Sequence, residues 1–317
     1  MRAWLRLIRL PNLATAVADS LAGFLVCAGV QQLDWLPPAA CWAIAASVCL
    51  YAAGMILNDV FDVDIDRAER PERPLPSRAI GLQTAALAGH GLLAAGVAAA
   101  VAAAVARGQI WPAVTGAILA AAVWLYDRHL KHHIILGPAT MGACRGLNWL
   151  LGMTAAGGPF ADQWLVPAGM AVYVAGITLF ARHEASAGAG ADKHGDSATT
   201  ALVLRAGAAT MILGLAIAAG PVWQAAGAGR PLPGSPVTTG NWLLLWGIIA
   251  ASVLVRALPA LVTAEPKPIR AAVGNAIMSI ITLDAILVLA YAGERWAVVV
   301  LALLVWFVLG KRIVPPT

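Results

Sequence analysis

Apolar stretches of about 20 residues, separated by short clusters of turn-forming and charged residues, recur along the whole chain. A stretch of this length is what an α-helix needs to cross the hydrocarbon core of a membrane. The last stretch is the shortest, so the pattern predicts a bundle of nine or ten membrane-spanning helices. We expect these spans near residues 12–30, 39–57, 81–105, 110–126, 134–156, 163–182, 199–220, 241–263, 270–292 and 296–310.

The composition favours an all-α polytopic membrane protein. Of the 317 residues, 60% are hydrophobic and 12% are charged, whereas about a quarter of the residues in a soluble domain are charged. No large aqueous domain fits, and we expect a single membrane domain over residues 1–317, in two halves of about 1–130 and 131–317. Pairs of small residues, such as Gly142 with Gly146, favour close packing of helices. The four cysteines are scattered without metal-ligand spacing, which argues against a disulfide framework or a zinc site.

The basic residues indicate the orientation of the spans. With a cytoplasmic N-terminus, 17 of the 21 Lys and Arg residues fall on the cytoplasmic side, three fall on the opposite side, and Arg145 lies within a span. The positive-inside rule therefore predicts an inner-membrane protein whose motif loops, residues 58–78 and 182–198, are cytoplasmic. Contact with anionic lipid headgroups explains the net charge of +5, so no nucleic-acid partner is expected. The basic start, Met1–Leu10, imitates a signal peptide, but it lacks a convincing cleavage site and predicts a retained first helix.

Six of the 16 acidic residues crowd into 14 positions at the end of the second span, in a segment that begins NDVFDVDID. Asn58, Asp62 and Asp66 recur every four residues, so on a helix they form one stripe, with Asp59 beside it and Asp64 pointing away. Neighbouring carboxylates repel one another unless a cation lies among them, and oxygen ligands without His or Cys favour Mg²⁺. The stripe therefore predicts a Mg²⁺ site that substrate phosphates complete.

The next segment, RAERPERPLPSR, is rich in arginine and proline. Its prolines prevent a continuous helix, which leaves the guanidinium groups on a loop over the acidic stripe. Acidic and basic side chains together at a membrane edge predict binding of a Mg²⁺-bridged diphosphate, with arginine as the direct phosphate contact. The alternative is a solvated loop held by salt bridges. The arginines are Arg67, Arg70, Arg73 and Arg78.

These two segments resemble those of a known family. Asn58, Asp59, Asp62 and Asp66 reproduce NDxxDxxxD, and RPERPLPS follows at the usual distance, as in the UbiA superfamily of intramembrane prenyltransferases. The resemblance covers essentially the whole chain. It implies a helical bundle around a central cavity open to lipid, where a prenyl diphosphate loses its diphosphate and the allylic cation alkylates an acceptor. Three further segments resemble the EboC branch, a UbiA-like protein of a bacterial gene cluster linked to secondary metabolism: RLPNLATAVADSLAGF, YDRHLKHHIILGPATMGACRGLNWLLGM and TLFARHEA.

The resemblance also implies roles for individual residues. Asn58, Asp62 and Asp66 are expected to hold Mg²⁺, with Asp59 tuning the site. Asn12 resembles the asparagine of the family's first helix beside the metal site. Diphosphate contacts are expected from Arg67, Arg73, Arg78, Arg182, Asn12 and Arg145.

Tyr126 and Lys131 resemble the tyrosine and the basic residue that follow the family's fourth span. The face of a tyrosine can stabilise an allylic cation, and a lysine can neutralise phosphate, so both are candidate catalytic residues together with Asp59. The alternative is an interfacial aromatic residue beside a lysine that obeys the positive-inside rule.

The chain departs from the superfamily at the second aspartate-rich motif, where it reads ARHEASAGAGADKHGDSATT. In one interpretation, Glu184 replaces a metal ligand, with Asp192 or Asp196 as its partner. In the other, the second metal is lost, and Arg182 with Lys193 neutralises part of the diphosphate charge. A third interpretation makes the loop a plain connector.

Polar residues within the spans are expected to face the cavity or one another, because an isolated charge in lipid is costly. Asn12, Thr15 and Asp19 share one face of the first span. Asp19 has two equal interpretations, a functional acid or a hydrogen-bonding partner of a neighbouring helix. Arg145, followed by Asn148 one turn later, needs an anion or a carboxylate.

The sequence thus predicts a Mg²⁺-dependent prenyltransferase that moves a prenyl group from a prenyl diphosphate to a hydrophobic acceptor, with an aromatic one expected. The alternative is a catalytically eroded UbiA-like protein that serves in the transport or assembly of a secondary metabolite, which the altered second motif favours. An ion-coupled transporter is less well supported, because the charges gather at one membrane edge and not at the midplane.

Overall fold

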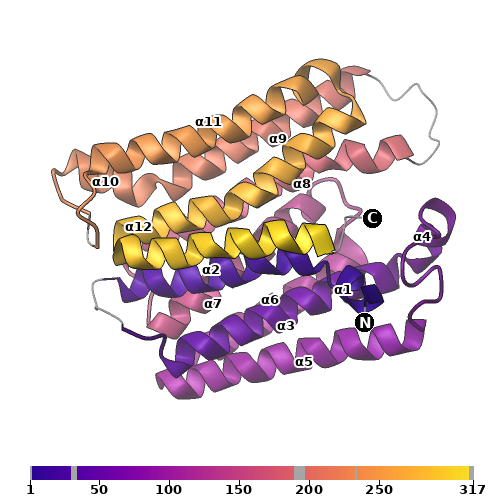
Figure 1. Cartoon of the computed structure of the whole chain (residues 1–317), viewed down its shortest axis with the longest axis horizontal. Coiled ribbons are helices and arrows are strands. Elements are labelled where there is room, and N and C mark those ends of the chain that lie inside the picture. Colours follow the sequence, from indigo (N-terminus) through magenta and orange to yellow (C-terminus); the bar gives the residue numbers. More distant parts are fainter. Residues whose placement is uncertain (1, 30–33, 189–196, 233, 314–317) are drawn as a thin grey trace.

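Helices make up most of the chain in the computed structural model, which describes residues 2–29, 34–188, 197–232 and 234–313 (Figure 1). The side chains of 183–188, 197, 198 and 313 lie outside the described residues. A π-helix, Tyr126–Leu130, continues α6, and a 3₁₀ turn, Ala161–Trp164, precedes α8. The α-helices are α1 Arg2–Leu7, α2 Leu10–Ala28, α3 Pro38–Phe61, α4 Val63–Glu69, α5 Leu82–Arg107, α6 Trp111–Leu125, α7 Leu136–Ala156, α8 Leu165–Gly188, α9 Ser197–Ala218, α10 Gly220–Gly227, α11 Thr239–Thr263 and α12 Pro266–Ile313.

Seven of the described helices are long and apolar enough to cross a membrane: α2, α3, α5, the segment containing α8, α9, α11 and α12. The 48 residues of α12 form two arms, because Gly293 breaks the helix with a φ of 82° that favours glycine. The shorter α6 and the more polar α7 lie within the same bundle. With both arms of α12 they bring the number of long helical segments in the described chain to ten. The predicted polytopic helical bundle is confirmed.

Close packing of small residues holds the helices together. A Cβ atom on Gly142 of α7 would lie 2.3 Å from the carbonyl oxygen of Ala171 on α8, and one on Gly146 would lie 3.0 Å from that of Pro167. Only glycine permits the first of these approaches, which confirms the packing expected of this pair. Between other helices, α2 packs against both α7 and α12, while α3 packs against α5 (Figure 1).

A small apolar cluster anchors the segment that follows α3. Leu7 of α1, Val63 of α4, and Leu75 and Ile80 of the following turns are buried together against α3 and α5. Residues 70–81 form turns and no helix, as the prolines predict, but the expected loop position of Arg67 is wrong, because α4 continues to Glu69 ahead of the first proline. At the other side of this cluster, Arg9 separates α1 from α2 in the left-handed region, with a φ of 49°. The charged segment is therefore fixed over one end of the bundle.

Candidate functional site

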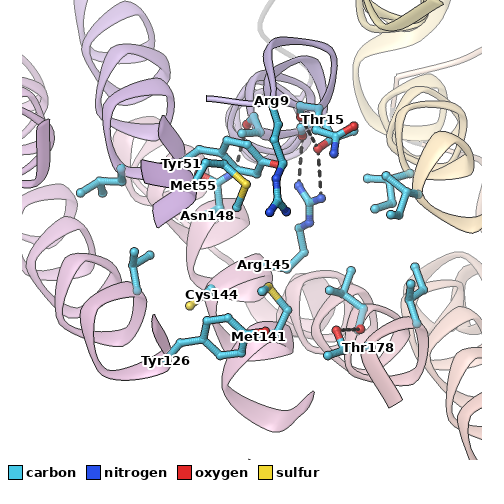
Figure 2. Close-up of a pocket in the computed structure, with 18 of the residues that line it drawn as sticks. Arg9, Thr15, Tyr51, Met55, Tyr126, Met141, Cys144, Arg145, Asn148 and Thr178 are labelled. Atoms are coloured by element: carbon cyan, nitrogen blue, oxygen red, sulfur yellow. Dashed lines mark hydrogen bonds between the residues drawn. The ribbon is translucent and has the colours of Figure 1, made fainter. Parts of the chain in front are cut away.

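A cavity of about 360 Å³ lies among α2, α3, α6, α7, α8 and the first arm of α12 (Figure 2). Leucine, isoleucine, valine and methionine side chains form much of its wall, so it suits an apolar ligand. The predicted residues Asn12, Tyr126 and Arg145 all line it. Its further polar and charged lining residues include Arg9, Thr15, Ser47, Tyr51, Asn148 and Thr178.

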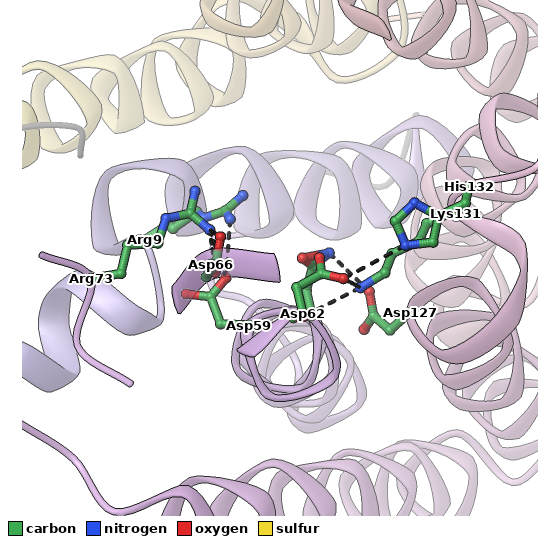
Figure 3. Close-up of polar contacts among 9 residues, drawn as sticks. Arg9, Asp59, Asp62, Asp66, Arg73, Asp127, Lys131 and His132 are labelled. Carbon is green, nitrogen blue, oxygen red and sulfur yellow. Dashed lines mark hydrogen bonds and ion pairs between the residues drawn. The ribbon is translucent and has the colours of Figure 1, made fainter. Parts of the chain in front are cut away.

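Two carboxylates of the acidic segment share arginine partners (Figure 3). Arg73 donates to both oxygens of Asp66, at 2.9 and 2.7 Å, and its Nη1 lies 3.8 Å from Asp59. Arg9, directly before α2, lies 3.3 Å from Asp59. Asp59, Asp66 and Arg73 are buried, which strengthens these pairs relative to exposed ones.

The third carboxylate, Asp62, lies with a different set of residues on the far side of α3 (Figure 3). Its Oδ1 is 2.7 Å from Nζ of Lys131 and 3.6 Å from Nε2 of His132. Lys131 also donates to the backbone oxygen of Asn58 at 3.3 Å, and the Asn58 amide donates to Asp127 at 3.4 Å. The turn between α6 and α7 therefore completes this half of the site. We call both halves together the acidic end of the cavity.

The expected single stripe is wrong, because the carboxylates divide into these two groups. Helix α3 ends at Phe61, and Asp62 takes φ and ψ of −96° and 6° before α4 begins. The break changes the direction of Asp66, which joins Asp59 and not Asp62. Backbone hydrogen bonds still join Asp62 to Asn58 at 3.1 Å and Asp66 to Asp62 at 2.8 Å, but the side chains of Asp62 and Asp66 have different partners.

The sequence-based prediction missed Asp127. It lies in the chain between Tyr126 and Lys131, which were both predicted as site residues. Asp127 is 2% exposed, and its Oδ2 has no hydrogen-bond partner. Burial raises the pKa of Asp127 to about 8, although Lys131 opposes the shift. The signal in the sequence was an aspartate one helical turn before a predicted phosphate-binding lysine.

The remaining predicted cations have varied surroundings. Arg67 pairs with Asp64 at 2.6 Å on the exposed surface, and Arg78 is exposed at a φ of 60°. Arg182 donates to the backbone oxygens of His132 and His133, at 2.7 and 2.6 Å, so it fixes the turn that carries Lys131. Glu184 lies in α8, but its side chain is outside the described residues, as are Asp192, Lys193 and Asp196.

A second polar group, which we call the inner cluster, contains Thr15, Asp19, Arg145, Asn148 and Asp284. Arg145 pairs with Asp19 and donates to the hydroxyl and backbone oxygens of Thr15, at 3.1 and 3.2 Å (Figure 2). Asn148 donates to Asp19 at 3.1 Å. Asp284 is fully buried, and neither of its carboxylate oxygens has a partner. The predicted need of Arg145 for a carboxylate is confirmed, whereas its contact with diphosphate stays a prediction.

Basic side chains, namely those of Arg9, Arg73 and Lys131, lie next to the carboxylates in this structure. Within the part of the chain that the structure describes, no three His, Cys, Asp or Glu side chains converge at a spacing that would hold a metal ion. The available ligand atoms nevertheless suit a hard cation, because Asn58 supplies an amide oxygen and Asp62 supplies carboxylate oxygens. The partnerless Oδ2 of Asp127 adds a buried oxygen beside them.

Comparison with known sequences agrees with the motif. Residues 17–281 match the UbiA prenyltransferase family. The digeranylgeranylglyceryl phosphate synthase of Metallosphaera sedula is 35% identical over 97 residues, which is 31% of this chain and 33% of that relative. The match thus spans about a third of this curated relative.

Solved structures share the fold. A structure of digeranylgeranylglyceryl phosphate synthase superposes with a TM-score of 0.65 and 20% identity, covering 92% of this chain and 98% of that one. A UbiA homologue from Archaeoglobus fulgidus bound to GPP and Mg²⁺ has a TM-score of 0.63 and 14% identity, covering 95% and 99%. At these identities the likeness establishes the architecture alone.

Proposed function

The chain belongs to the UbiA prenyltransferase family, and from this premise we propose that it transfers a prenyl group from a prenyl diphosphate to a hydrophobic acceptor within the membrane. The observation that carries the proposal is an apolar cavity of about 360 Å³ beside a group of paired carboxylates and cations. Such a place suits a molecule with a diphosphate head and a hydrocarbon tail. The homologue from Archaeoglobus fulgidus binds GPP with Mg²⁺, which supports the same pairing here.

Asn58, Asp62 and Asp127 would hold Mg²⁺ on one side of α3, and Asp59 with Asp66 on the other. When bound, the ion supplies charge neutralisation that makes diphosphate a better leaving group. Asp59, Asp62 and Asp66 each have a basic partner in the structure, whereas Asp127 accepts a hydrogen bond from the Asn58 amide and would have to release its proton to bind a cation. With Mg²⁺ bound, these carboxylates would be its ligands, and their present basic partners would be available to bind phosphate.

Arg73 and Lys131 are the best-placed diphosphate ligands, because both already contact carboxylates of the acidic end. Arg182 holds the turn of Lys131 through two backbone carbonyls, so its contribution is at least positional. Arg67 and Arg78 lie on the exposed surface and would contact phosphate only from outside. Orientation by these groups puts the prenyl tail into the cavity.

Tyr126 lines the cavity next to the acidic end, where its ring can stabilise positive charge on an allylic carbon. The apolar wall excludes water, which would otherwise capture the cation. We propose further that the acidic end faces the cytoplasm at the inner membrane, as the positive-inside rule indicates. Membership of the EboC branch and an aromatic acceptor belong to the same proposal.

The test is pyrophosphate release by the purified full-length protein in detergent, with geranyl, farnesyl or geranylgeranyl diphosphate. We expect release that requires Mg²⁺ and disappears with EDTA. Binding of a prenyl diphosphate without release at any chain length would instead favour the eroded protein that serves in transport or assembly. Absence of both binding and release would contradict the proposal.

A further inference from the structure

The cavity wall carries two cations, and each has a carboxylate partner in the described chain. Arg9 lies at the acidic end, 3.3 Å from Asp59. Arg145 lies nine residues into α7, about 13 Å along the helix axis from its first residue. Its partner Asp19 is fully buried, as is Asp284. The question is what charge the inner cluster offers to a ligand in the cavity.

The inner cluster has no positive charge left over. Arg145 contributes one positive charge and Asp19 one negative charge, which balance. Asp284 is either protonated, which leaves the cluster neutral, or ionised, which adds a second negative charge. Under both conditions an anionic ligand head would be desolvated at this end without a compensating cation, which is costly in a membrane interior.

The uncharged polar groups on the wall also restrict the ligand. Ser47 donates its hydroxyl to the backbone oxygen of Ala16 at 2.9 Å, and Thr178 donates to that of Val174 at 2.9 Å. Their hydrogens are used, but each oxygen retains lone pairs that can accept. A ligand head that donates a hydrogen bond therefore finds an acceptor in Ser47, which shares the Ala16 oxygen with Asn148, whereas Thr178 lies nearer the acidic end, one turn from Arg182.

We propose that the inner end of the cavity selects an acceptor whose head is uncharged and donates a hydrogen bond, such as a phenol or an alcohol, and rejects a carboxylate. This inference rests on the proposed function and names its acceptor class. Asp19 is the specificity-determining residue. It acts through Arg145, whose charge it balances, and the anionic diphosphate is left to the acidic end.

The test compares 4-heptylphenol with 4-heptylbenzoate, two probes of similar apolar size, at pH 7.5, where the first is neutral and the second anionic. Isothermal titration of the full chain in detergent, without Mg²⁺ or diphosphate, gives the two affinities after correction for partition into empty micelles. We expect the wild-type protein to bind the phenol at least about tenfold more tightly. Equal affinities, a preference for the benzoate, or no binding of either probe would overturn the inference.

Two amide variants sharpen the test. Asp19→Asn keeps an oxygen that accepts from Arg145 but removes the balancing charge, so the phenol-to-benzoate affinity ratio should fall by about tenfold. Asp284→Asn is the matched control, because Asp19 still balances Arg145 and the variant should still bind the phenol more tightly than the benzoate. An unchanged ratio in Asp19→Asn contradicts the inference, and the wild-type ratio tests it even if that variant does not fold.

Failure here can be told apart from failure of the proposed function. Probe selectivity without pyrophosphate release would mean that the cavity binds a neutral lipid-like ligand without transferring a prenyl group. Release without selectivity would leave the transferase proposal standing and remove only the acceptor class.

Discussion

The acidic end and the inner cluster use the same residue types for different purposes. Both pair aspartates with basic side chains, as in Asp62 with Lys131 and Asp19 with Arg145. At the acidic end, several carboxylates and cations lie within reach of one another, and His132 beside them is exposed. In the inner cluster one arginine, with a side chain that is 12% exposed, contacts a buried aspartate and a threonine of the facing helix, and the Asn148 amide donates to the same aspartate.

The difference shows how surroundings decide whether an ion pair can exchange its partner. At the acidic end Asp59, Asp66 and Arg73 are buried too, but several alternative charged partners lie within reach, so a change of pairing need not leave a charge alone. Within the bundle, separation of Asp19 from Arg145 would leave both charges desolvated. We therefore expect the acidic end to rearrange around a ligand and the inner cluster to stay fixed, and the following predictions test that contrast.

The largest effect is expected at the acidic end. Asp62→Ala and Asp66→Ala should each abolish turnover of prenyl diphosphate, because each removes an oxygen that Mg²⁺ requires. The measurement is pyrophosphate release at saturating Mg²⁺, with the folded state checked by size-exclusion chromatography. Asp64→Ala is the matched control, since its side chain is exposed and pairs with Arg67 on the surface. Wild-type turnover in either test variant would refute the metal assignment.

The inner cluster should respond in stability. Asp19→Leu should lower the free energy of unfolding by about 3–5 kcal/mol, because Arg145, with a side chain that is 12% exposed, loses the carboxylate with which it pairs. The double variant Asp19→Leu with Arg145→Met should recover most of that loss, since neither charge is then buried. Unfolding in SDS titrations gives both values. A double variant no more stable than the single one would show that the pair is not coupled as described.

At the acidic end, Asp127 should make the stability of the fold depend on pH. Its pKa of about 8 in the folded protein exceeds the usual value near 4, so the folded form binds the extra proton between these pH values. Stability therefore falls as pH rises from about 4 through about 8. Asp127→Asn removes this loss. The unfolding midpoint of the variant minus that of the wild type should therefore increase from pH 5 to pH 9 in metal-free detergent. A difference that stays constant with pH would contradict the assignment, and Asp64→Asn provides the exposed control.

The smallest effects concern the altered second motif. Arg182→Ala should weaken diphosphate binding by about 1.5–3 kcal/mol, the scale of a hydrogen bond to a charged group, with the Mg²⁺ requirement unchanged. If Glu184 is a ligand, Glu184→Gln should instead raise the Mg²⁺ concentration needed for activity. Parallel titrations of Mg²⁺ and inorganic pyrophosphate distinguish the two outcomes. If neither variant alters either titration, the loop is a connector.

The sequence predicts the acidic end better than the detailed contacts within it. Residue spacing and proline placement reveal a helix followed by an arginine-rich turn. The residue spacing does not predict the break at Asp62, and the next residue, Val63, is buried in a cluster with Leu7 and Ala85, which lie far from it in the sequence. The part of Asp127 in the site depends on a contact between the turn after α6 and Asn58 of α3, which residue spacing does not reveal.

For the inner cluster, the cost of charge in lipid predicts that Arg145 needs an anion, and helical periodicity places Thr15 and Asp19 on one face. Sequence alone could not choose Asp19 over another carboxylate, since the partners are 126 positions apart. That choice depends on α2 packing beside α7, which small residues permit. Gly152 is one of them, because a Cβ there would lie 1.9 Å from the Ser20 carbonyl oxygen.

The central position of α2 has a consequence for biogenesis. This helix leaves the ribosome well before α7 supplies Arg145 and before α12 folds Gly310 against Pro11, where a Cβ would meet Pro11 at 3.1 Å. Until α7 has been made, Asp19 cannot pair with Arg145. During synthesis α2 must therefore wait inside the insertion machinery or at its lipid boundary with a protonated or hydrated carboxyl, and the bundle closes around it only when the final arm of α12 arrives.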